Sequence, residues 1–79
     1  MNARLTKYIE FEQEDYKGKT KKWVFWNKKD GHICARVYWY GGWRKYVVEL
    51  YGNGFYDWGF LRMLAEFSEQ ETLKQLGKL

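Results

Sequence analysis

The chain has 79 residues, a net charge of +4 and one cysteine, Cys34. This length predicts one small domain, residues 1–79, and a single cysteine excludes an intrachain disulfide, which fits a reducing compartment. No apolar run approaches the roughly 18 residues that span a membrane, and the first residues lack the apolar segment of a signal peptide, so we expect a cytoplasmic protein. Five Trp, seven Tyr and five Phe exceed what one small core needs, so some rings should stay near the surface.

The first predicted strand lies near residues 4–12, where Ile9 and Phe11 alternate with polar residues. Residues 13–22 are polar and contain a glycine, which predicts a connecting segment. The second strand follows near residues 22–28 and begins with large apolar side chains.

The turn after this second strand decides which of its side chains reach the core. A two-residue turn ending at Gly31 would place Val24 and Trp26 on the core face. A three-residue turn with Gly31 in the left-handed conformation would place Trp23 and Phe25 there instead. We prefer the second turn, because two lysines and an aspartate followed by glycine suit a type I turn. In either case two large side chains lie on the outer face.

The next two strands, near residues 32–40 and 43–51, form a hairpin around Gly41-Gly42. A glycine pair is typical of a two-residue turn, in which both central residues need positive φ. With that turn, the core face collects Ile33, Ala35, Val37, Trp39, Tyr46, Val48 and Leu50, with Arg44 at its end. The outer face collects Cys34, Arg36, Tyr38, Tyr40, Trp43, Lys45, Val47 and Glu49. A one-residue slip would mix the two sets, so turn and pattern agree.

The C-terminal part predicts two short helices. Asp57 is a good N-cap for a helix near residues 58–67. A second helix is predicted near 69–76, because Ser68 begins a capping-box pattern and Gly77 suits a helix end. The elements together predict an α+β fold, in which an antiparallel three-stranded meander has an additional N-terminal strand and the C-terminal helical segment packs on one face.

The order of three strands followed by a helix resembles integrase arm-binding domains and the small basic chromatin proteins of archaea. The likeness lies in element order alone, so no functional residue is carried over from those families.

Catalytic chemistry has little support in the sequence. His32 and Cys34 lie two residues apart on a predicted strand and so share a face, with Glu49 predicted opposite Cys34. A thiol–imidazole pair or a metal site needs further groups at recognised spacings, and Walker and dinucleotide-binding glycine patterns are absent. We therefore expect no enzyme activity, no cofactor and no metal.

The outer sheet face is the candidate site. Its predicted binding residues are Trp26, Lys28, Arg36, Tyr38, Tyr40, Trp43 and Lys45. Rings stack on bases while neighbouring cations meet phosphates, which favours nucleic acid as the partner. The alternative is a protein-binding inhibitor or adaptor, for example a phage-type antagonist, that uses the same face and residues 51–60 to bind a larger protein or nucleoprotein. The N-terminal strand, or a homodimer formed through this face, would instead bury it.

Overall fold

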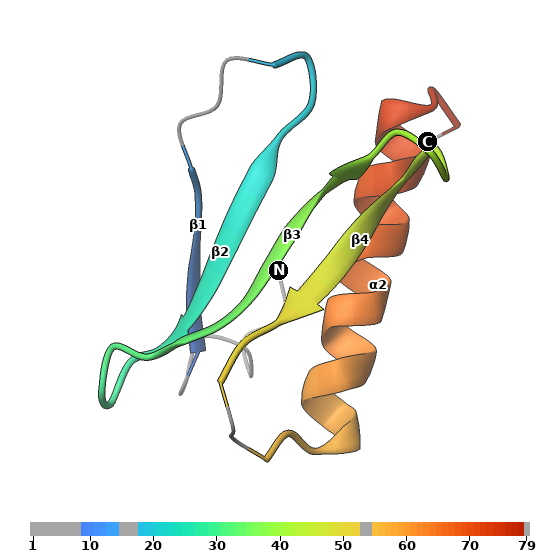
Figure 1. Ribbon diagram of the computed structural model, residues 1–79. Helices are drawn as coiled ribbons and strands as arrows, with labels where there is room; N and C mark the ends of the chain where they lie inside the picture. The colour runs from blue at the N-terminus through green and yellow to red at the C-terminus, as the bar shows by residue number, and fades with distance from the viewer. Residues whose placement is uncertain (1–8, 15–17, 53–54, 79) are drawn as a thin grey trace.

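The computed structural model describes residues 9–14, 18–52 and 55–78 and contains one antiparallel sheet and one helix in them (Figure 1). The elements are β1 (Ile9–Gln13), β2 (Lys22–Asn27), β3 (Ile33–Tyr40), β4 (Lys45–Leu50) and α2 (Trp58–Gln75). The strand order is β1-β2-β3-β4, and α2 packs against the sheet beside β4. The predicted α+β class, with a meander, an N-terminal strand and a C-terminal helix, is confirmed. Residues 4–8 of the predicted first strand lie outside the described residues.

The turn between β2 and β3 has the predicted left-handed glycine, but it comprises four residues, 28–31, closed by Asn27 and His32, rather than the predicted three. Gly31 has φ +74°, and its N–H donates to the carbonyl of Asn27 over 2.8 Å. The Asn27 N–H in turn donates to the His32 carbonyl over 2.8 Å. Trp23 and Phe25 belong to the core, as the preferred turn predicts.

A bulge near the start of β3 changes the predicted faces of two residues. Phe25 pairs with Ala35 and Trp26 pairs with Ile33, so Cys34 is the extra residue between two pairs. An extra residue interrupts the alternation of side chains along a strand. Cys34 is therefore buried rather than exposed on the outer face, and Ile33 lies beside Trp26 on the outer face rather than in the core.

The predicted two-residue turn between β3 and β4 is wrong. The connection comprises residues 41–44, closed by the pair Tyr40–Lys45, and neither glycine has positive φ. Arg44 takes the left-handed conformation instead, with φ 54°. Gly42 allows close packing rather than a special backbone conformation, because a Cβ at this position would lie 3.2 Å from the Tyr40 ring. The longer turn shifts the register by two residues, and a shift of two leaves the paired side chains on their predicted faces.

The core lies between the sheet and α2 and consists mainly of aromatic rings. Phe67 of α2 makes edge-to-face contacts with Trp23 and Phe25, at centroid distances of 5.0 and 5.4 Å. Phe11 of β1 stacks on Phe25 at 5.2 Å, and Leu64 is buried in the same cluster. The large area that these aromatic rings bury helps to explain how so short a chain forms a core without disulfides.

Leu50 does not join the core to which the sequence assigns it. It pairs with Ala35 at the end of β4, yet it is 48% exposed. The core face of the hairpin is thus covered along Val37 and Tyr46 and becomes open to solvent at this end of the strand.

The two predicted helices are one helix. Asp57 caps its N-terminus as predicted, accepting a hydrogen bond from the Phe60 N–H over 2.9 Å, and Gly77 follows its end with φ +73°. Ser68 does not cap a second helix, because its hydroxyl donates to the Ala65 carbonyl within the continuing helix. Thr72 ties this half of the helix to β4, since its Oγ1 accepts the Tyr46 N–H over 2.9 Å.

The described part of β1 extends the sheet at its edge and leaves the outer face open. Ile9 and Phe11 pack with the helix-side core, while Glu10 and Glu12 alternate with them on the opposite face. The alternative in which this strand folds over the aromatic outer face therefore does not hold for residues 9–13. The helix found in the described residues does not have the length and hydropathy of a membrane span.

Candidate binding surface

Most of the predicted site residues share the sheet face away from α2. The strand residues on this outer face are Trp26, Arg36, Tyr38, Tyr40 and Lys45. Trp43 lies in the β3–β4 turn, whereas Lys28 lies in the β2–β3 turn at the opposite end of the sheet (Figure 1). Lys28 is therefore not brought together with Trp43.

The rings of Tyr40 and Trp43 form an exposed pair at the β3–β4 turn. Their centroids are 4.9 Å apart with an interplanar angle of 81°, which is an edge-to-face contact. Trp43 is 66% exposed and Tyr40 is 46% exposed. Two large rings are thus held in a fixed mutual arrangement while much of their surface stays in solvent.

Three cations lie at this end of the outer face, near the rings of Tyr38, Tyr40 and Trp43. Lys45 pairs with Tyr40 across the strands, and Lys22 lies over the Tyr38 ring, with 5.6 Å between Nζ and the ring centroid. Arg44 is exposed in the turn, and neither Arg44 nor Lys45 forms an ion pair with a described residue. We define the hairpin-tip surface as Lys22, Tyr38, Tyr40, Trp43, Arg44 and Lys45.

The sequence prediction misses Lys22 and Arg44 as members of this surface. Lys22 joins it because it pairs with Tyr38 in the register of β2 and β3. Arg44 joins it because the four-residue turn removes it from the end of the core face, where the shorter turn places it. The alternation of side chains along β2 is the signal that points Lys22 outward, on the side opposite Trp23.

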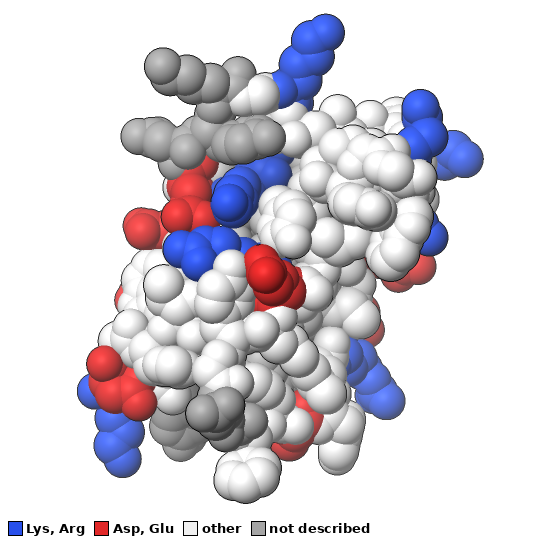
Figure 2. Space-filling view, in the orientation of Figure 1, with Lys and Arg blue, Asp and Glu red and all other residues white. Residues whose placement is uncertain are grey.

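Arg36 lies on the outer face but is already engaged by neighbouring side chains. Its Nε donates to Glu14 Oε1 over 3.1 Å, and its guanidinium lies 5.2 Å from the centroid of the Tyr51 ring. Hydrogen bonding to Tyr51 and Glu14 raises the pKa of Arg36. Figure 2 shows acidic and basic groups adjoining in the middle of the visible face, while basic groups project from its upper end. Arg36 therefore belongs to a mixed-charge region rather than to the hairpin-tip surface.

Tyr38 holds its hydroxyl proton more tightly than an ordinary tyrosine. The negative charge of Glu49 is the main cause that raises the pKa of Tyr38, with smaller contributions from burial and from Tyr51. An ordinary tyrosine is already uncharged at neutral pH, so the Tyr38 hydroxyl can donate a hydrogen bond there, and its raised pKa only extends the neutral form to more alkaline pH.

His32 and Cys34 do not form a reactive pair. The Cys34 thiol donates to the His32 backbone carbonyl over 3.7 Å, and burial raises the pKa of Cys34, which disfavours the thiolate. Glu49 pairs with Arg36 and not, as predicted, with Cys34. Within the described ranges, no cluster of three His, Cys, Asp or Glu side chains is arranged to hold a metal ion.

A second exposed aromatic region lies around the N-terminus of α2. Phe55 is fully exposed and Trp58 is 73% exposed. Leu61 is also exposed one helical turn after Trp58, and the Arg62 guanidinium lies 5.0 Å from the centroid of the Trp58 ring. These residues overlap with the 51–60 segment that the sequence favours for protein binding.

No family model, curated protein or solved structure matches this chain significantly.

Proposed function

We propose that this protein is a non-catalytic module that binds single-stranded nucleic acid through the hairpin-tip surface. The observation that carries the proposal is the exposed, edge-to-face pair of Tyr40 and Trp43 with Arg44 and Lys45 beside it. Exposed rings offer π-faces on which bases stack, at about 1–3 kcal/mol per base. The three cations of this surface, Lys22, Arg44 and Lys45, meet the phosphates of the bound strand.

The arrangement favours a single strand over a duplex. The bases of a single strand are free to unstack and reach an aromatic ring, whereas the bases of a duplex are stacked on one another. The two rings are set nearly perpendicular, so they cover part of each other, and Trp43, which is 66% exposed, offers the larger free surface for stacking. The acidic side chains of β1, Glu10 and Glu12, repel phosphates and confine the strand to the basic end of the sheet.

The test is oligonucleotide binding by Trp43→Ala, measured as the fluorescence anisotropy of a fluorescein-labelled twelve-residue oligothymidylate. We expect the affinity to fall about 5- to 150-fold, which corresponds to the loss of one stacked base at 1–3 kcal/mol. Trp58→Ala is the matched control, because Trp58 is similarly exposed but lies at the start of α2. Equal losses in the two variants, or none in either, would contradict the proposal.

A second candidate function is protein binding through the N-terminal end of α2. The fully exposed Phe55 beside the exposed Trp58 favours it, because protein interfaces are enriched in such rings. With this function, Trp58→Ala rather than Trp43→Ala would weaken capture of the partner.

A further inference from the structure

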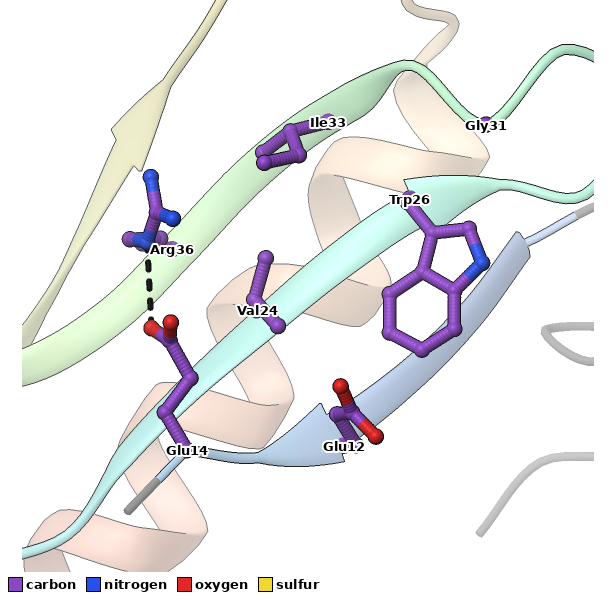
Figure 3. Close-up of a pocket in the computed structure, with 7 residues that line it drawn as sticks. All are labelled: Glu12, Glu14, Val24, Trp26, Gly31, Ile33 and Arg36. Atoms are coloured by element: carbon purple, nitrogen blue, oxygen red, sulfur yellow. Dashed lines mark hydrogen bonds and ion pairs between the residues drawn. The ribbon is translucent and has the colours of Figure 1, made fainter. Parts of the chain in front are cut away.

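The outer face also carries an open hollow nearer to β1, with a volume of about 350 Å³. Its lining comprises Glu12, Glu14, Val24, Trp26, Gly31, Ile33 and Arg36 (Figure 3). The bulge at Cys34 creates part of its apolar wall, because it turns Ile33 outward beside Trp26. The hollow is therefore a product of the local fold rather than of the simple alternation of side chains.

The two sides of the hollow differ in whether their acidic side chain is paired with a basic one. On one side Glu14 is bonded to Arg36, which compensates its charge. On the other side Glu12 lies beside the Trp26 indole and forms no ion pair with a described residue. Glu10 pairs with Trp26 across the strands on the same face. The charged strand residues on the face beside the indole, Glu10 and Glu12, are thus both acidic.

Arg36 does not occupy the side of the hollow that holds the indole. Its contacts with Glu14 and with the Tyr51 ring hold it toward β4. Figure 3 shows Val24 between Arg36 and Trp26, with the Glu12 carboxylate near the indole. The Arg36 guanidinium therefore does not block the indole or the Glu12 carboxylate, and a cation from another molecule can reach both.

We propose that this hollow binds an arginine or lysine side chain of a protein partner. The face of an indole attracts a guanidinium or ammonium group placed within about 6 Å of its centroid. The Glu12 carboxylate supplies a charge-assisted hydrogen bond to the same group. The half-buried Ile33 offers apolar surface to the methylene stem of the side chain, while Val24, which is buried, closes the hollow beneath it. A phosphate would be repelled by the same carboxylates, so the occupant is basic protein and not nucleic acid.

Binding of a cation in the hollow is independent of oligonucleotide binding by the hairpin-tip surface. The test uses N-acetyl-arginine-N-methylamide as the probe and its uncharged citrulline counterpart as the matched control. Addition of the arginine compound should shift the Trp26 indole N–H and the Glu12 amide signals in the ¹H–¹⁵N spectrum, whereas the citrulline compound should not. Equal shifts with both compounds, or shifts confined to other residues, would overturn the proposal.

Two variants locate the effect. Glu12→Gln removes the carboxylate with little change in shape, and Trp26→Leu removes the aromatic face. Each variant should bind the arginine compound about fivefold more weakly, because it loses the charge-assisted hydrogen bond or the cation–π contact. Glu66→Gln is the control, because it removes the same charge from an exposed position on α2. If Glu66→Gln weakens binding as much as Glu12→Gln does, the attraction is only a general effect of net charge and the hollow is not the site.

Discussion

Phe25→Ala is expected to lower the free energy of unfolding by about 3–5 kcal/mol, the cost of removing a fully buried Phe ring. Phe25 is 0% exposed, stacks on Phe11 and meets the edge of Phe67, so it joins β1, β2 and α2 in one cluster. A domain of this length is stable by only about 4–12 kcal/mol. The variant should therefore lose much of its stability, as measured by urea unfolding followed by far-ultraviolet circular dichroism.

Phe55→Ala is the matched control for this loss, because it makes the same substitution at a fully exposed position. We expect it to change the unfolding free energy by less than about 0.5 kcal/mol. If Phe25→Ala is too unstable to measure, Phe25→Leu should still cost about 1 kcal/mol or more, since it leaves part of the cavity filled. A Phe25→Ala protein as stable as the Phe55→Ala protein would show that the rings do not form the core described above.

The affinity of the protein for a single-stranded oligonucleotide should fall steeply with salt. The hairpin-tip surface presents Lys22, Arg44 and Lys45, and three phosphate contacts predict a slope of about −2 for log affinity against log salt concentration. The affinity should therefore fall about 20-fold between 50 and 200 mM salt. Anisotropy titrations of the labelled oligothymidylate at four salt concentrations measure this slope.

Variants that each remove one positive charge show how much each cation contributes to the slope of log affinity against log salt concentration. Lys45→Gln should make the slope shallower by about 0.7, because one phosphate contact is lost. Lys29→Gln should leave it unchanged, since Lys29 is exposed in the β2–β3 turn at the other end of the sheet. A slope that responds equally to both substitutions would indicate diffuse attraction by the net charge.

The sequence predicts the faces of the β3–β4 hairpin better than its pairing. Placing the turn at Gly41-Gly42 gives the wrong partners, because Tyr46 pairs with Trp39 and not with Val37. The predicted register is wrong by two residues. Because side chains along a strand alternate between the two faces with a period of two, every paired residue still lies on its predicted face. For this reason Tyr38, Tyr40 and Lys45 lie on the face that the sequence predicts.

Features that depend on contacts between distant parts of the chain could not be predicted. The bulge at Cys34 is set by the pairing of β2 with β3, which no local pattern encodes. The capping pattern at Ser68 predicts a new helix, yet the Ser68 hydroxyl donates to the Ala65 carbonyl within a continuous helix, whose later Thr72 is bonded to Tyr46 of β4. The pair between Arg36 and Glu14 joins residues 22 positions apart, so local patterns do not reveal that Arg36 is engaged.

If the proposed function holds, the hairpin-tip surface contacts the oligonucleotide and the start of α2 does not. The most direct measurement follows the indole N–H signals of the five tryptophans in ¹H–¹⁵N spectra while the oligothymidylate is added at 50 mM salt. We expect the Trp43 signal to move most and the Trp58 signal to stay in place. Movement of the Trp58 signal with a stationary Trp43 signal, or no movement of any indole signal, would contradict the proposed function.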